Sequence, residues 1–339
     1  MYRKPQRGFS LLETLVCLVI LLAVGGIVMS GMVQLMKTQN TIANRTEMHT
    51  SVRSATELLQ QEIGQAGKVS LAPPAVNVTM GTVPVAGNQA IVWTSPGVTP
   101  VVYPTEWLTV DVGNAQETVQ VGGTPSSPTA FFTKPHPSPL TPVTALGAFA
   151  TGVVPPDAPS VGVCANSVLP TGGNYPGFPS GSTCSVLKLY GDVNDDGNMV
   201  YIEYTCQQGT PAAPGFLYRN QMPISQAGKP AVDNTKILLN NVLGNPNDVN
   251  GNPVSCFTYQ VRQIGTVGAV YGVTNVALTL TVQTQNIDPV TRTNQTETKA
   301  LLNVGPRNIV EVWGTASLVD PTRAQPMPPT VTALLPYPN

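Results

Sequence analysis

The sequence predicts an α+β protein, in which a long N-terminal helix packs on an antiparallel β-sheet domain that carries a Pro/Gly-rich insertion. Three observations predict this class. Residues 9–36 form an apolar run with a single charged residue. Residues 37–68 show the 3.6-residue period of an amphipathic helix. Beyond residue 68, short runs rich in Val, Thr, Tyr and Leu are bounded by Gly, Pro, Asn or Asp, as is typical of β-strands.

The composition excludes several classes of protein. Only 10% of the 339 residues are charged, and 17 Lys and Arg residues nearly balance 18 Asp and Glu residues. A chain without a basic excess lacks the electrostatic footprint of a nucleic-acid-binding protein, so no nucleic-acid partner is expected. The 42% of hydrophobic residues are too many for a disordered polyelectrolyte. The 31 Gly and 33 Pro residues predict many turns and argue against an array of helical repeats.

The apolar run over residues 9–36 is expected to cross a membrane. As a helix, its 28 residues would measure about 42 Å, and a hydrocarbon core is about 30 Å thick. Three basic residues precede the run and one, Lys37, follows it, which predicts a cytoplasmic N-terminus and an exported C-terminal part. The alternative is a cleaved secretory signal. Such a signal has a shorter apolar region and a small-residue cleavage site, which we do not find.

The junction between the basic leader and the apolar run reads Arg7-Gly8-Phe9-Ser10-Leu11-Leu12-Glu13. It resembles the cleavage and methylation motif of type IV prepilins and of type II secretion pseudopilins. The resemblance implies that residues 1–8 are a leader peptide, that a prepilin peptidase cuts between Gly8 and Phe9, and that the new amine of Phe9 is methylated. It also implies a type IV pilin-like fold and assembly with other pilins or pseudopilins on an inner-membrane platform.

Glu13 is the one charged residue of the apolar run. A carboxylate inside a membrane helix is costly without a partner and is a functional residue by default. Cleavage after Gly8 would create a positive amine four residues away, and opposite charges attract strongly where the dielectric constant is low. By the family resemblance, Glu13 forms its assembly charge pair with the amine of a neighbouring subunit.

Residues 37–68 are expected to continue the same helix, and its second half is expected to pack on the exported domain. Gly67 is the predicted C-cap. Residues 51–67 resemble the end of the long helix in PilW-like minor pilins and in J-type pseudopilins. The predicted apolar positions of this part, which recur at helical spacing, are Ile42, His49, Val52, Leu58, Leu59, Ile63 and Ala66.

The exported part is expected to be all β. It is divided into a β-rich region with the Pro/Gly-rich insertion (69–185), a C-terminal β-sheet region (186–320) and a Pro-rich tail (321–339). Twelve prolines between Gly122 and Ser180 predict an insertion rather than core strands. The tail, with six prolines, is expected to be extended or mobile. The predicted strands cover residues 90–94, 101–103, 107–110, 186–190, 199–205, 257–263 and 276–284.

Four cysteines lie in the part expected to be exported, where an oxidising compartment permits disulfides. Four cysteines allow three connectivities. We expect the pairs Cys164–Cys184 and Cys206–Cys256, with unpaired buried thiols as the alternative. Cys17 lies in the apolar run and is expected to be a small hydrophobic residue there.

Residues 192–198 read Asp-Val-Asn-Asp-Asp-Gly-Asn and, with Glu203, fit the calcium-loop pattern D-x-[DN]-x-[DN]-G-x5-E. The candidate calcium ligands are Asp192, Asn194, Asp196, Asn198 through its carbonyl, and Glu203. Residues 200–205 read as a strand, which makes Glu203 the least suited of them. The alternative is a β-hairpin with an Asp-Gly turn, which needs no metal and resembles a hairpin of PilW-like minor pilins.

These features predict a non-enzymatic filament subunit that requires no cofactor. The leading interpretation is a minor subunit, initiating or tip-associated, of a type IV pilus. The alternative is a J-type minor pseudopilin of a type II secretion system. A membrane-anchored exported enzyme or binding module is disfavoured, because no catalytic motif is found and two histidines leave few general bases. The expected location is the bacterial inner membrane, with a single pass, and then the pilus or pseudopilus.

Overall fold

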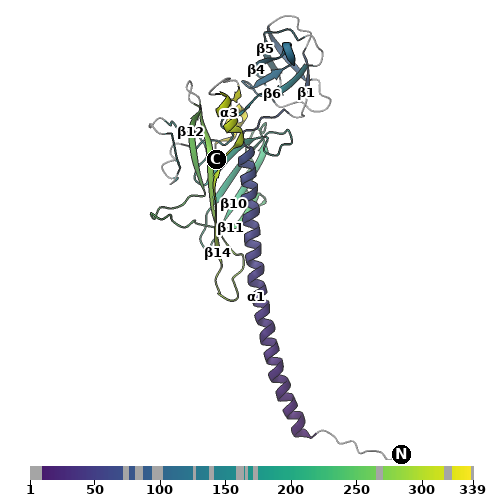
Figure 1. Cartoon of the computed structure of the whole chain (residues 1–339), viewed down its shortest axis with the longest axis vertical. Coiled ribbons are helices and arrows are strands. Elements are labelled where there is room, and N and C mark those ends of the chain that lie inside the picture. Colours follow the sequence, from purple (N-terminus) through teal and green to yellow (C-terminus); the bar gives the residue numbers. More distant parts are fainter. Residues whose placement is uncertain are drawn as a thin grey trace, which may run out of the picture. The chain divides into compact units, whose positions relative to one another are not determined.

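A computed structural model describes residues 10–71, 76–80, 87–93, 102–124, 127–136, 141–157, 164, 167–170, 175–264, 270–316 and 323–336 (Figure 1). A long N-terminal helix is followed by antiparallel β-sheet structure, an α+β arrangement like that of pilins, so the predicted fold class is confirmed. The chain divides into two compact units. One holds the chain up to Thr50 together with Gln283–Thr296, and the other holds Ser51–Val282 and Glu297–Asn339.

Helix α1 (Leu11–Gln65) runs without interruption for 55 residues. It ends because Gly67 adopts a positive φ of 86°, a conformation that glycine tolerates best. The amide of Gly67 donates to the carbonyl of Tyr190 at 2.9 Å. The side chain of Asn308 donates to the last carbonyls of the helix, those of Gln65 at 3.0 Å and Ala66 at 3.2 Å. The predicted end of the helix at Gly67 is therefore confirmed.

The second half of α1 buries one face. Val52, Leu59, Ile63 and Ala66 are buried, as the periodicity predicted, and Leu58 is half-buried. Two other predicted positions are wrong: Ile42 is 58% exposed and His49 is exposed. Both lie at multiples of seven residues before Thr56, so they are close to the phase of the buried stripe but precede its continuous part, which begins at Val52. From Val52 onward its members are Val52, Ala55, Thr56, Leu59, Glu62, Ile63 and Ala66.

Among the described residues, seven strands form the larger sheet, in the order β12-β13-β11-β10-β9-β8, with β14 also paired to β13. The strands are β8 (Val186–Gly191), β9 (Val200–Gln207), β10 (Gly215–Pro223), β11 (Ile237–Leu243), β12 (Phe257–Ile264), β13 (Val270–Gln283) and β14 (Thr296–Val304). The 3-10 turn η2 (Asn234–Lys236) precedes β11. In β13 the large apolar side chains of Val276, Leu278, Leu280 and Val282 recur at every second position and are all buried.

The two faces of β8–β10 carry different partners. Tyr204 of β9 lies opposite Arg219 of β10, and both reach Glu62 of α1. Lys188 of β8 lies opposite the next residue of β9, Glu203. Because neighbouring residues of a strand point to opposite faces, Lys188 and Glu203 lie on the face away from α1.

A second β structure occupies the region assigned to the insertion. The described strands form a closed barrel in the order β1-β2-β5-β4-β3-β6, with β6 paired back to β1. Its strands are β1 (Val76–Met80), β2 (Gly87–Trp93), β3 (Trp107–Val110), β4 (Glu117–Thr124), β5 (Ser127–Phe132) and β6 (Thr141–Ala145), with the 3-10 turn η1 (Gly113–Ala115). Its buried core is made of Leu71, Val102, Leu108, Val110, Val119, Val121, Ala130, Phe132 and Val143.

This barrel corrects the expectation that the segment between Gly122 and Ser180 lacks core strands. Pro128 and Pro142 each occupy the second position of their strand, where one missing donor weakens only the strand end. The predicted strand over residues 101–103 is also wrong, since Val102 and Tyr103 are buried in irregular backbone.

The C-terminal tail is packed in its described residues, which corrects the expectation of an extended or mobile segment. Strand β15 (Ala324–Gln325) pairs in parallel with β7 (Ala148–Phe149), and helix α4 (Pro329–Leu334) follows. The prolines do not prevent this helix because Pro329 is its first residue, where proline is favoured. Upstream, helix α3 (Arg307–Ala316) buries Ile309 and Val312 beside Ala148, Ala150 and Ile264.

The four cysteines beyond α1 are paired. Cys164 is joined to Cys184 and Cys206 to Cys256, with Cα–Cα distances of 5.2 and 6.4 Å. These are the two expected pairs. The first bridge ties a loop residue to the residue two positions before β8, and the second joins β9 to the residue that precedes β12.

Candidate functional site

The candidate functional site at the N-terminus is described from Ser10 onward, and Gly8 and Phe9 lie outside the described residues. Helix α1 begins at Leu11, and Glu13 lies in its first turn. The amide of Glu13 donates to the carbonyl of Ser10 at 3.0 Å, and the hydroxyl of Thr14 donates to Leu11 at 2.9 Å. A carboxylate in the first turn interacts favourably with the positive end of the helix dipole. Glu13 therefore lies where the helix terminus and an N-terminal amine would both attract it.

The helix that follows Glu13 is an unbroken apolar surface. Every residue from Ser10 to Asn40 is exposed, including Leu11 at 83% and Ile27 at 73%. In the part of the chain that the structure describes, α1 is the one helix long and apolar enough to cross a membrane. Cys17 is the free cysteine of the described residues and is exposed on this surface. So large an apolar surface indicates contact with lipid or with other subunits.

The second half of α1 is held to the sheet by an ion pair that the sequence analysis missed. Nε of Arg219 lies 3.1 and 3.3 Å from the carboxylate oxygens of Glu62, and Nη2 of the same guanidinium also contacts this carboxylate. The hydroxyl of Tyr204 donates to the other side of the carboxylate. Burial lowers the pKa of Arg219, but its contacts with Glu62 outweigh this and raise it. The signal available in the sequence was an acidic residue, Glu62, in phase with the buried stripe.

The Asp-rich loop between β8 and β9 is closed by its own backbone and by Lys68. The carboxylate of Asp192 is 1% exposed and accepts the amides of Asp196 at 3.1 Å and Gly197 at 3.2 Å. It also accepts the hydroxyl of Ser70 at 2.6 Å. Nζ of Lys68 lies 3.6 Å from Asp192 and pairs with Asp195, and the hydrogen bond to Asp195 is the main cause that raises the pKa of Lys68.

The remaining candidate ligands do not complete a metal site in this arrangement. Asp196 accepts the amide of Asn198 at 2.8 Å, and Asn194 and Asn198 are exposed. Glu203 lies within β9 and accepts the hydroxyl of Tyr201 at 2.9 Å and Nζ of Lys229 at 2.6 Å. No group of three His, Cys, Asp or Glu side chains among the described residues is placed to hold a metal ion. The ammonium of Lys68 places one positive charge beside Asp192 and Asp195.

A buried lysine joins the sheet to the C-terminal helix, and the sequence analysis missed it as well. Lys188 is 0% exposed, and its Nζ donates to the carbonyls of Ser180 at 2.9 Å and Leu335 at 2.6 Å. Burial lowers the pKa of Lys188 to about 8. Lys188 therefore closes the C-terminal end of α4.

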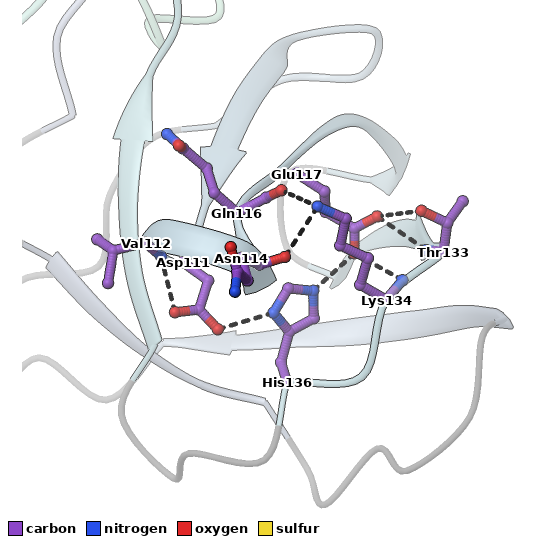
Figure 2. A network of polar contacts seen from close by, with 8 residues as sticks. All are labelled: Asp111, Val112, Asn114, Gln116, Glu117, Thr133, Lys134 and His136. Atoms are coloured by element: carbon purple, nitrogen blue, oxygen red, sulfur yellow. Dashed lines mark hydrogen bonds and ion pairs between the residues drawn. The ribbon is translucent and has the colours of Figure 1, made fainter.

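His136 lies between two carboxylates in the barrel, as Figure 2 shows. Its Nδ1 is 3.0 Å from Oδ2 of Asp111, and its Nε2 is 2.6 Å from Oε1 of Glu117. Glu117 also accepts the amide and the hydroxyl of Thr133. Lys134 donates to the carbonyls of Asn114 and Gln116 (Figure 2). The hydrogen bond from His136 is the main cause that lowers the pKa of Asp111.

These contacts tie η1 and the start of β4 to the residues after β5. The two ring nitrogens of His136 are both directed at carboxylates, so the ring links the residues after β5 to Asp111 and to Glu117 of β4.

One further buried carboxyl lies next to the barrel. Glu106 is 0% exposed and accepts the amide of Tyr103 at 3.2 Å, while its Oε1 has no hydrogen-bond partner among the described residues. Burial raises the pKa of Glu106 to about 8. The carboxyl is thus neutral in the folded protein at neutral pH.

Comparison with known proteins identifies the N-terminal segment. Residues 3–33 match the prokaryotic N-terminal methylation motif, a range that includes Gly8, Phe9 and Glu13. No curated protein and no solved structure gives a significant match to the chain. The motif supports a type IV pilin or pseudopilin subunit and suggests a structural role. It implies processing by a prepilin peptidase, a membrane-anchored chain and assembly with other pilins.

Proposed function

We propose that this chain is a minor subunit of a type IV pilus, located at the initiating or tip end of the filament. The observation that carries the proposal is the match of residues 3–33 to the methylation motif, with Glu13 in the first turn of an exposed apolar helix. In this role the leader is removed after Gly8, Phe9 is methylated, and the apolar part of α1 anchors the subunit in the inner membrane until it enters the filament.

The end position is supported by the size of the exported part. Besides the larger sheet, the described residues contain a closed barrel that follows directly after the C-terminal end of α1. A subunit that repeats throughout a thin fibre must leave room for its neighbours on every side. A subunit with a second β structure is better accommodated where the filament ends.

The charge-pairing role of Glu13 can be tested with Glu13→Ala in the native host. We expect normal membrane insertion and loss of incorporation into sheared filaments, because the N-terminal amine of the neighbouring subunit would be buried without a counter-charge. The matched control is Glu57→Ala, since Glu57 is an exposed residue of the same helix. Normal incorporation of Glu13→Ala would refute the role.

Mass spectrometry of filament material tests the processing. The proposal expects a mature chain that begins at Phe9 and carries one methyl group on its amine. A mature start well beyond Phe9, or an unprocessed Met1, would overturn it. Deletion of the gene then separates the two machines: a pilus subunit is required for surface filaments, and a pseudopilin is required for protein secretion.

A further inference from the structure

The connection between β13 and β14 presents two apolar side chains to the exterior. Residues 284–295 join the strands, and Ile287 and Val290 are 64% and 63% exposed. Single exposed apolar residues are normal on a protein surface. These two differ because their loop belongs to the same compact unit as the apolar part of α1.

The loop is held in one conformation by Asp288. This residue is 3% exposed, and its carboxylate accepts the amide of Val290 at 2.7 Å and the hydroxyl of Thr41 at 2.9 Å. Two further contacts join the loop to α1: the side-chain amide of Asn286 donates to Asn44 at 3.4 Å, and Nε of Arg45 donates to the amide oxygen of Gln295. Residues three and four apart share one helix face, so Thr41, Asn44 and Arg45 fix the loop at a defined height along α1.

A groove of about 660 Å³ lies between this loop and the helix. From the helix, Met29 and Val33 line it, and Lys37 lies one to two turns further toward the C-terminus. From the loop, Val290 and Arg292 line it. Ser30, Gln34 and Thr38 also line it, so the groove combines apolar, uncharged polar and two cationic side chains.

The position of the groove along α1 matches the boundary of a bilayer. If about 20 residues from Ser10 cross a hydrocarbon core of about 30 Å, the core ends near Met29. The residues from Met29 to Lys37 then span about 12 Å, which covers the headgroup layer. Apolar side chains at this depth insert into the boundary between headgroups and acyl chains, and Lys and Arg side chains meet the lipid phosphates.

We propose that this groove is a phospholipid-binding site at the exported surface of the inner membrane. A lipid phosphate lies between Lys37 and Arg292, and an acyl chain runs along Met29, Val33 and Val290. The loop is thus a second membrane contact beside the anchor. This inference rests on the proposed membrane anchoring of α1.

The test uses the full chain with Cys17→Ser, reconstituted in vesicles of phosphatidylethanolamine and phosphatidylglycerol. A fluorophore is attached to Val290→Cys, and its quenching is measured with spin-labelled lipids that carry the label at the headgroup or deep in the acyl chain. Val249→Cys, whose native side chain is fully exposed in another loop, is the control for water, and Leu21→Cys in the apolar run is the control for the bilayer core. We expect headgroup-labelled lipid to quench the probe at position 290 several-fold more than the probe at 249.

Two results of this measurement have separate meanings. A probe at 290 that behaves like the probe at 249, while the probe at 21 is quenched by the deep label, overturns the lipid site and leaves the anchor intact. If the probe at position 21 is not quenched by the label deep in the acyl chain, both the lipid site and the proposed membrane anchor are overturned.

The charged lining is tested by native mass spectrometry of the chain released from the same lipids. We expect the chain to retain a phospholipid, and Lys37→Gln with Arg292→Gln to lose it. The matched control is Arg262→Gln with Lys299→Gln, which removes two exposed charges from strands. Equal lipid retention by both double variants overturns the proposal. The proposal is also overturned if the fluorophore at position 290 is shielded from water only in samples whose chains have been cross-linked to one another. A second subunit would then occupy the groove.

Discussion

The guanidinium of Arg219 on β10 forms an ion pair with the buried carboxylate of Glu62 on α1, across 157 positions of the sequence. Replacing Arg219 by Ala would leave a carboxylate that is 2% exposed without its counter-charge. We expect a loss of about 3–5 kcal/mol in the free energy of unfolding, measured by denaturant titration in detergent.

Two comparisons control this prediction. The ion pair of Arg53 and Glu57 is exposed, so Arg53→Ala should change stability far less than Arg219→Ala does. The double variant Glu62→Leu with Arg219→Leu should be more stable than Arg219→Ala, because no buried charge remains. An Arg219→Ala variant as stable as Arg53→Ala would contradict the assigned role of the pair.

Gly67 and Gly64 provide an opposed pair of substitutions near the end of α1. Gly67→Ala should destabilise the fold by at least about 1–2 kcal/mol, because a left-handed backbone disfavours a Cβ. The added Cβ would also lie 2.9 Å from the carbonyl oxygen of Phe149. Gly64→Ala should stabilise it by about 0.5–1 kcal/mol, since Gly64 is helical and a Cβ there meets nothing within 4 Å. Thermal unfolding of both variants checks this, and a change of the same sign in both would be inconsistent with it.

The Asp-rich loop should be stable without calcium, because Lys68 compensates the charges of Asp192 and Asp195. We expect millimolar calcium to leave the Tm of the native chain unchanged. Lys68→Met should lower the Tm through repulsion among the carboxylates, and calcium should restore part of the loss. A rise in the Tm of the native chain on adding calcium would instead support the calcium site that the sequence pattern predicts.

Glu106 should make stability depend on pH between about 5 and 8. Burial raises its pKa to about 8, so the folded state keeps a proton that the unfolded state releases above its ordinary pKa of 4.5. Stability is therefore lost as the pH rises through this window, by up to about 1.4 kcal/mol per pH unit. Lys188 does not contribute there, since it is protonated in both states below its folded pKa of about 8.

The substitution Glu106→Gln should remove this slope, as followed by denaturant titration at several pH values. Glu57→Gln, at an exposed position of α1, should keep it. An unchanged slope in Glu106→Gln would show that another group is responsible.

Features governed by local patterns could be predicted from the sequence. The apolar run and the amphipathic period predicted one long helix, and Gly67 marked its end because a single residue type tolerates that conformation. The strand Trp107–Val110 was predicted with its observed bounds, because Val, Thr, Leu and Trp favour strands and turn residues flank it.

Features that depend on distant residues could not be predicted in this way. The barrel closes when β1 pairs with β6, whose first residue lies more than sixty positions from the start of β1. The tail was misjudged because proline content says nothing of where a proline falls within an element, and Pro329 begins a helix. In the candidate site, Gly8, Phe9 and Glu13 lie within one short stretch of the chain, so their motif can be found from the sequence alone. The partners of Glu62 and Lys188 come from other elements and need the fold.

The packing of α4 has a consequence for the order in which the chain completes its fold. Val331, Leu334 and Leu335 are buried in one cluster with Tyr190, Tyr201 and other side chains of the larger sheet and its loops. This hydrophobic core is therefore incomplete until residues 331–335 have joined it. Because α1 precedes these residues in the chain, it is made before this core can close. A product truncated before Val331 would keep α1 but leave this core open, which would make it more sensitive to proteases than the native chain.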